Sequence, residues 1–259
     1  MRAAVDAYDE YRNGEHAWML GAFVVPSTRI GELAECSPES DRDDPWPLSV
    51  LAPSVSAAPR SCADGFELRA LEVAPLEPAA ILAGSGGAPE GVRVFYEVPL
   101  DDRMDARLDA VARVGGAAKV RTGGVTAEAF PAASRLAELV GACADRSLAF
   151  KATAGLHHPV HGCYALTYEP RSPTANMFGF LDLAFVAALL RARRIDTAEA
   201  AVLLRGSADG VVPESGGVRW QGHAISTAEM SALRREHFLS FGSCSFEEPV
   251  ADLQRIGLL

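Results

Sequence analysis

Lysine is almost absent from this sequence of 259 residues: two of its 24 basic side chains are lysines and the others are arginines. The two are Lys119, in AAKVRTGGV, and Lys151, in LAFKATAGLHHPVHG. Both lie in apolar segments that run into threonine and glycine. Because ionisable side chains rarely enter such segments without a partner or a function, these two lysines are the first candidates for a functional site.

Other absences argue against whole classes of protein. The five cysteines are odd in number and form no CxxC pair, so we expect a reducing, cytoplasmic location rather than a disulfide framework. The net charge of −10 argues against a protein that binds nucleic acid or an acidic membrane over a broad surface. The most apolar run, 178–190, is too short to span a membrane and contains Asp182.

Nucleotide-binding and serine hydrolase motifs are missing as well. The glycine-rich stretch GSGGAPEG (84–91) lacks the GxGxxG spacing, because Pro89 stands where the third glycine should be. GSADG (206–210) carries Ala208 where the serine of a nucleophile elbow would stand. We therefore expect no organic cofactor and no serine hydrolase chemistry.

Strand-like and helix-like segments alternate along almost the whole chain. Helical periodicity is clearest over 101–114 and 131–146, and 36–47 is a polar loop bounded by proline. The predicted strands are 18–25, 48–52, 66–73, 92–98, 117–122, 148–153, 217–222 and 239–243. This alternation predicts an α/β fold: a (β/α)8 TIM-like barrel, or alternatively an open doubly wound parallel sheet. We expect one domain over 1–259, with a helical insertion at about 176–206.

The two lysines are predicted to face one pocket. Residues on a strand alternate between its faces, so Lys119 points the same way as Arg121, and Lys151 the same way as Thr153. The two strands are consecutive and joined by one helix, so we expect them to be neighbours. The pocket would then hold both lysines and Arg121, with His157 and His158 on the loop above it.

This pocket is compatible with three roles. A lysine there can act as a base or form a Schiff base with a carbonyl substrate. Lysine and arginine can instead hold a phosphate, sulfate or carboxylate, and the glycines then let backbone N–H groups approach the anion. Alternatively, each lysine pairs with a buried carboxylate, for which Glu72 and Glu97 are the candidates. The anion-binding residues predicted on these two strands are Arg121, Thr122, Gly123, Gly124 and Thr153.

The last predicted strand offers a second place for the anion. Gly242 and Ser243 stand between that strand and a helix N-terminus, where barrels often bind phosphate. Ser245 with Glu248 has the spacing of a capping box, and so has Ser226 with Glu229. Ser245 is therefore expected to cap the final helix whether or not an anion binds.

The histidines after the second lysine are predicted to act in proton transfer. His157 and His161 have a metal-like spacing, but no acidic or cysteine set stands nearby in the sequence to complete a metal site. We therefore expect no metal. A histidine titrates close to neutral pH, so His157 or His158 can serve as a general acid or base.

Four segments together resemble an uncharacterised family of bacterial hypothetical proteins: AWMLGAFVVPSTRIGEL, KVRTGGVTAEAFP, FKATAGLHHPV and FGSCSFEEPVADLQRIGLL. The resemblance covers nearly the whole chain and implies no established activity. Members of that family begin further upstream. If the upstream segment closes the barrel or supplies a catalytic acid, the resemblance implies that the barrel here is incomplete at its N-terminus and that a partner chain completes it. The two lysine segments are also similar, in motif shape alone, to the K-x-[ST]-x-G segments of lysine-dependent class I aldolases.

The sequence thus predicts a lyase of bacterial biosynthesis that acts on a small anionic substrate. Lys151 would be the base or Schiff-base former, Lys119 and Arg121 would hold the anion, and His157 or His158 would move protons. Imine aldol chemistry and elimination of a sulfate or phosphate both fit. The alternative is a non-catalytic, anion-binding subunit of a biosynthetic complex, in a homo- or hetero-oligomer whose partner completes the pocket.

Overall fold

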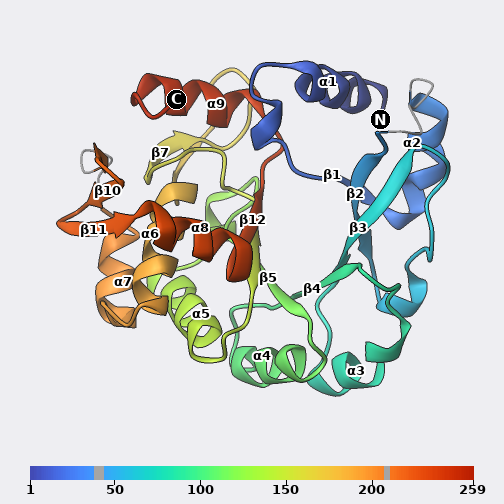
Figure 1. Cartoon of the computed structure of the whole chain (residues 1–259), viewed down its shortest axis with the longest axis horizontal. Coiled ribbons are helices and arrows are strands. Elements are labelled where there is room, and N and C mark those ends of the chain that lie inside the picture. The colour runs from blue at the N-terminus through green and yellow to red at the C-terminus, as the bar shows by residue number, and fades with distance from the viewer. Residues whose placement is uncertain (38–43, 207–210) are drawn as a thin grey trace.

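The fold is built on one parallel sheet of seven strands, which curls into a half-barrel (Figure 1). The computed structural model describes residues 1–37, 44–206 and 211–259. The strands of this sheet are β1 (Phe23–Pro26), β2 (Trp46–Ala52), β3 (Phe66–Val73), β4 (Arg93–Glu97), β5 (Ala117–Arg121), β6 (Phe150–Thr153) and β12 (Phe238–Gly242). They follow one another in chain order, with β1 and β12 at the two edges. Strand order in a doubly wound sheet reverses at a switch point, so this sequential order fits the barrel-like prediction better.

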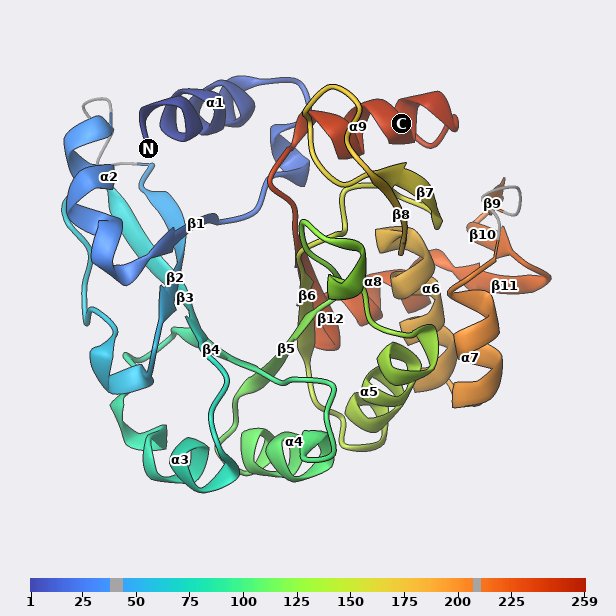
Figure 2. The same ribbon diagram turned by 180° about the vertical axis from the view of Figure 1, so that it is seen from behind.

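The predicted α/β class is confirmed, whereas a complete eight-stranded barrel is not seen. Within the described residues β1 and β12 do not pair with each other, so the sheet stays open. Helices α1 (Arg2–Asn13) and α9 (Glu247–Arg255) lie beside the opening (Figures 1 and 2). The Tyr11 and Phe246 rings, 5.0 Å apart between centroids, connect the two helical segments across it.

The strand predicted over 217–222 exists, but its place in the barrel was predicted wrongly. It is β10 (Gly217–Trp220), the centre of a three-stranded antiparallel sheet with β9 (Val211–Glu214) and β11 (His223–Ser226). The cause is the turn that follows it: Gln221 and Gly222 have φ of 44° and 86°. Two left-handed residues in a row make a tight hairpin, whereas a parallel barrel strand needs a long crossover.

The chain leaves the main sheet between β6 and β12 for much longer than predicted. The helical insertion expected at about 176–206 is present as α6 (Phe180–Arg191) and α7 (Thr197–Leu203). It is flanked by a hairpin of β7 (Gly162–Ala165) and β8 (Thr174–Met177), by the small sheet, and by α8 (Thr227–Glu236). This excursion forms the side of the molecule next to β12 (Figure 2).

The outer face of the sheet carries the main hydrophobic core. Helices α4 (Met104–Arg113) and α5 (Ala133–Asp145) confirm the two predicted helices. The apolar residues that repeat with helical spacing in these two helices are all buried: Met104, Leu108 and Val111 in α4, and Leu136, Leu139, Val140 and Cys143 in α5. The other helices are α2 (Ile30–Cys36) and α3 (Pro78–Ala83), with short 3-10 turns at Ala17–Met19, Ser27–Arg29, Val55–Ala57, Ser85–Gly87 and Ala127–Ala129.

Two sequence predictions fall partly or wholly outside the described residues. They are the polar loop over 36–47, of which 38–43 is not described, and the position of Ala208 within 207–210. Among the residues that the structure describes, no helix combines the length and apolar character needed to cross a membrane.

Candidate active site and a neighbouring thiol cluster

The concave face of the sheet is charged where a closed barrel is usually filled with branched apolar side chains. A small apolar floor is formed by Ala70, Phe95 and Ala117. The next residues along the same face of the strands are acidic or basic. We call them the lysine–glutamate layer: Glu72 of β3, Glu97 of β4, Lys119 of β5 and Lys151 of β6. The strand register places Glu97 beside Lys119 and Lys119 beside Lys151.

The lysine–glutamate layer is a continuous ion-pair network. Lys119 Nζ lies 3.0 Å from Glu72 Oε2 and 3.1 Å from Glu97 Oε2. Lys151 Nζ lies 2.5 Å from Glu72 Oε1, which also accepts a hydrogen bond of 2.7 Å from Ser49 Oγ. The two lysines therefore converge, as predicted, and they meet on the two carboxylates that the pairing alternative named.

Glu72 is the centre of this network. It is 2% exposed, and Lys119 and Lys151 are 4% and 5% exposed. Burial by itself would raise the pKa of Glu72, but the charges of Lys151 and Lys119 and the hydrogen bonds from Lys151 and Ser49 outweigh it, so the pKa is lowered. Glu72 is thus held as a carboxylate in a site that water barely reaches.

Arg121 lies at the rim, at the end of β5, and its side chain is exposed. It lines a cavity of about 280 Å3 together with Glu97, Glu128 and the segment 98–100. No carboxylate in the described part of the chain forms an ion pair with Arg121. The guanidinium group of Arg121, which has no carboxylate partner in the described residues, and Glu97 of the lysine–glutamate layer therefore line the same cavity.

The threonine and glycines after β5 stabilise the loops at the ends of β5 and β6. Thr122 Oγ1 donates a hydrogen bond of 2.6 Å to the carbonyl of Ala154, whose left-handed backbone (φ 61°) turns the chain after β6. A Cβ on Gly123 would lie 2.3 Å from the Phe130 ring, and a Cβ on Gly155 would lie 2.7 Å from the same ring. These glycines let Phe130 close over the two loops.

The remaining predicted anion-binding residues lie at the ends of their strands. A Cβ on Gly124 would lie 2.8 Å from Ala129 Cβ. Gly242 is paired with Thr153 in the sheet, and a Cβ on Gly242 would meet Thr153 Oγ1 at 2.9 Å. Ser243 follows directly and turns its hydroxyl to His157 Nδ1, 3.2 Å away. The ends of β6 and β12 therefore stand together, as an anion site spanning both would require.

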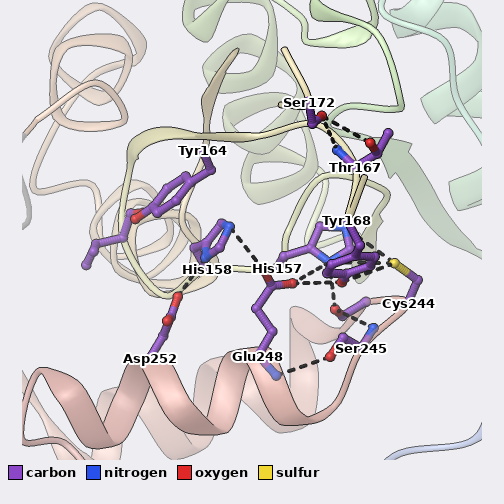
Figure 3. Close-up of polar contacts among 12 residues, drawn as sticks. His157, His158, Tyr164, Thr167, Tyr168, Ser172, Cys244, Ser245, Glu248 and Asp252 are labelled. Carbon is purple, nitrogen blue, oxygen red and sulfur yellow. Dashed lines mark hydrogen bonds and ion pairs between the residues drawn. The ribbon is translucent and has the colours of Figure 1, made fainter. Parts of the chain in front are cut away.

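His157 and His158 do not contact either lysine within the described residues; they belong to a second cluster above β6 and β12 (Figure 3). His157 Nδ1 lies 3.3 Å from Glu248 Oε2, and Cys244 Sγ lies 3.7 Å from that nitrogen. His158 stacks on Tyr164 at 3.5 Å between ring centroids, and its Nδ1 lies 2.6 Å from Asp252 Oδ2.

Glu248 joins three segments that are far apart in the sequence. Its backbone N–H donates to Ser245 Oγ at 3.1 Å, which is one of the two contacts of the predicted capping box, but the N-cap of α9 is Phe246 and not Ser245 as predicted. The other half is absent from this helix start, because the Glu248 carboxylate instead accepts from Tyr168 OH at 3.0 Å and contacts His157. The box at Ser226 and Glu229 is complete. The carboxylate of Glu248 is thus diverted from capping into the cluster.

We call His157, Tyr168, Cys244 and Glu248 the thiol cluster. The hydrogen bond with His157 is the main cause that lowers the pKa of Cys244, and the same contact is the main cause that raises the pKa of His157. Sequence reasoning found only the histidine. The available signal was FGSCSFEE itself, in which a cysteine stands between the end of a strand and the first turn of a helix, a place that favours thiolates.

Within the described residues, no group of three or more histidine, cysteine or acidic side chains is arranged to hold a metal ion. A comparison with protein-family models finds no matching family, and comparisons with curated proteins and with solved structures find no match either. The geometry of the lysine–glutamate layer and the thiol cluster is therefore what indicates a function for this chain.

Proposed function

We propose that the chain is a lyase that forms an imine between Lys151 and the carbonyl group of a small anionic substrate. The observation that carries this proposal is the bracketing of one buried carboxylate, Glu72, by two lysine ammonium groups. In a barrel, this level near the carboxyl ends of the strands is where catalytic groups stand. We also propose that the open sheet is an incomplete (β/α)8 barrel.

Glu72 supplies the proton acceptor that imine formation requires. In the resting ion pair Lys151 donates its protons to Glu72 and presents no free lone pair. Transfer of one proton from Lys151 Nζ to Glu72 leaves a neutral amine, which attacks the substrate carbonyl carbon. The carbonyl oxygen leaves as water, taking up two protons, one from the nitrogen and one returned by Glu72. The positively charged imine then accepts the electron pair of the carbon–carbon bond that breaks, while a hydroxyl group on the departing carbon gives its proton to Glu72 and becomes a carbonyl group.

Lys119 keeps a positive charge next to Glu72 throughout this cycle. Its ammonium group contacts both Glu72 and Glu97, so one positive charge remains beside Glu72 whether or not Glu72 carries the proton. The exposed guanidinium of Arg121, at the cavity that Glu97 also lines, would hold the phosphate, sulfate or carboxylate of the substrate. The substrate class is therefore an aldehyde or ketone with one anionic group.

A second candidate function is favoured by the open sheet. Strands β1 and β12 are unpaired on their outer sides within the described residues, and open edges are places where another chain can add. The chain would then be an anion-binding, non-catalytic subunit of a biosynthetic complex, and the lysine–glutamate layer would be a structural ion-pair network. In that case both lysines keep their carboxylate partners permanently.

Borohydride trapping separates the two functions. The protein is incubated with a panel of small aldehydes and ketones that carry phosphate, sulfate or carboxylate, then reduced and digested. We expect a stable adduct on the peptide that contains Lys151. Lys151→Arg is the matched control, because arginine keeps a cation beside Glu72 but forms no such imine.

The trapping has two other outcomes. An adduct retained at the same level in Lys151→Arg would assign the imine to another amine and end the proposal. Absence of any adduct across the panel, together with elimination of sulfate or phosphate that depends on Lys151, would replace imine formation with base catalysis. Absence of both would leave the subunit function as the better account.

The anionic part of the substrate can be tested without knowing the substrate. The melting temperature is measured against sulfate and phosphate at matched ionic strength, for the wild type and for Arg121→Gln. An anion held at a hundred times its dissociation constant stabilises the folded state by about 2.7 kcal/mol. We expect a larger rise in the wild type than in the variant, and equal rises would remove Arg121 from the site.

A further inference from the structure

The thiol cluster has a chemistry that the lysine–glutamate layer does not use. Its sulfur is on a cysteine that is exposed to solvent, between β12 and α9. Cys244 Sγ lies 3.7 Å from His157 Nδ1 and 3.8 Å from His157 Nε2, so the imidazole ring faces the sulfur. Tyr168 OH is 3.9 Å from the sulfur (Figure 3).

The acidic partner lies near the same nitrogen of His157 as the sulfur does. Glu248 contacts His157 Nδ1 at 3.3 Å and also lies 3.7 Å from His158 Nε2. A carboxylate at this position favours the imidazolium form of His157, and an imidazolium beside a thiol favours the thiolate. The titratable groups around the sulfur of Cys244 are His157 and His158 from the loop after β6, Tyr168 from the β7–β8 connection, and Glu248 from α9.

We propose that Cys244 is a reactive thiolate that reduces small hydroperoxides, with His157 as its proton donor. The sulfur attacks the terminal oxygen of the hydroperoxide and forms an S–O bond, while the O–O bond breaks. The electron pair goes to the leaving oxygen, which takes a proton from His157. The sulfur is oxidised to a sulfenic acid, and the hydroperoxide is reduced to an alcohol, or to water when it is hydrogen peroxide.

A hydroperoxide suits this place better than a larger electrophile. Sensitivity to oxidation follows thiolate character and exposure, and the cluster combines both. The attack needs only a sulfur, a proton donor for the leaving oxygen and access from solvent. The cavity of about 280 Å3 described above is lined by other residues, so the sulfur does not belong to the space beside Arg121.

The chain contains its own reference thiol. Cys163 in β7 is also exposed, and no side chain in the described part of the protein hydrogen-bonds its sulfur. The reduced full-length protein is treated at pH 6.5 with iodoacetamide in one series and with hydrogen peroxide in another, where dimedone traps the sulfenic acid. Mass spectrometry then gives the rate at each cysteine in the same sample. Both reagents are uncharged, so the surrounding charges do not bias their approach.

We expect Cys244 to react about threefold faster than Cys163 or more. An ordinary thiol is only a few per cent ionised near pH 7, and the gain in ionised fraction is partly offset by the lower nucleophilicity of a more stable thiolate. His157→Gln should bring the ratio close to one in both series. Glu248→Gln, which leaves His157 in place, should lower the ratio without abolishing it.

Several results would overturn the proposal. Equal rates at the two cysteines, or an advantage of Cys244 that survives in a folded His157→Gln variant, would remove the thiolate pair. Fast alkylation with peroxide oxidation no faster than at Cys163 would remove the hydroperoxide chemistry. If His157→Gln does not fold, Glu248→Gln decides, and an unchanged ratio there counts against the pair. No substrate of Lys151 is needed, so the result is independent of the imine proposal.

Discussion

Two carboxylates of this protein are equally buried and have opposite acidities. Glu72 in β3 and Asp182 in α6 are each 2% exposed. Two lysines and a serine face Glu72, and its pKa is lowered. Asp182 accepts hydrogen bonds from the backbone of His161 and Gly179 but pairs with no cation in the described residues, and burial raises its pKa to about 7.

The difference shows that burial alone raises the pKa of a carboxyl group, and that its charged partners determine whether the group is nevertheless ionised at neutral pH. Neutral hydrogen-bond donors do not hold Asp182 fully ionised near neutral pH, whereas two ammonium groups hold Glu72 ionised. Both lysines of the chain contact Glu72. A buried, permanently charged carboxylate is needed both by an active-site base and by a structural ion pair. Stability measurements show how much this network contributes to the free energy of unfolding.

The largest expected effect comes from breaking the network at its centre. Glu72→Gln keeps the shape of the side chain but leaves Lys151 buried without a carboxylate, so we expect a loss of about 3–5 kcal/mol in the free energy of unfolding. Glu97→Gln is the matched control: Glu97 is more exposed, and Lys119 keeps Glu72 in that variant. Urea unfolding at pH 7 measures both. Equal losses would show that Glu72 is not the centre of the network.

The stabilisation that Glu72 provides, measured as the difference between the wild type and Glu72→Gln, should depend on pH. Because the folded-state pKa of Glu72 is lowered, its contribution is fully present above the unfolded pKa of about 4.3 and is lost as pH falls through the folded value. The stability difference between wild type and Glu72→Gln should therefore shrink in acid. A difference that stays constant down to the pH of acid unfolding would contradict an ionised Glu72.

Asp182 should behave in the opposite way, with the second largest effect. Its folded pKa of about 7 lies above the unfolded value, so the folded state holds the proton more tightly and stability falls as pH rises toward 7. From pH 5 to pH 8 this group should cost the wild type about 2–3 kcal/mol. Asp182→Asn cannot ionise and should lose less over that interval. Parallel stability curves for the two proteins would show that Asp182 is ionised throughout.

Much of the lysine–glutamate layer could be predicted from the sequence, whereas the charge state of Asp182 depended on distant contacts. Strand alternation and register placed Lys119 and Lys151 on one face, and the pairing with Glu72 and Glu97 was among the alternatives it left open. The predicted helices and the seven predicted strands that overlap strands of the main sheet needed only local periodicity. The hairpin at Gln221 and Gly222 defeated the same reasoning, because two left-handed turn residues outweigh the alternation around them.

The sequence indicated single members of the thiol cluster, but it could not show that they come together. Its members come from the loop after β6, the connection between β7 and β8, and the start of α9. No spacing in the chain relates Tyr168 to Cys244, and Glu248 carried a simpler interpretation as the second half of a capping box. Only the folded chain shows that its carboxylate is turned toward His157 and Tyr168.

Two hydroxyl groups extend the comparison from charge to hydrogen bonding, with the smallest expected effects. Ser49 Oγ donates to Glu72 at 2.7 Å in a buried site, and Tyr168 OH donates to Glu248 at 3.0 Å from a side chain whose residue is 71% exposed. A hydrogen bond to a buried charge contributes about 1.5 kcal/mol or more, whereas an exposed one competes with water. We expect Ser49→Ala to lose about that amount and Tyr168→Phe about 0.5 kcal/mol or less. Thermal and urea unfolding of the two variants compare them directly. A larger loss in Tyr168→Phe would mean that the thiol cluster stabilises the fold. Substitutions in that cluster would then change the stability of the protein as well as the reactivity of Cys244.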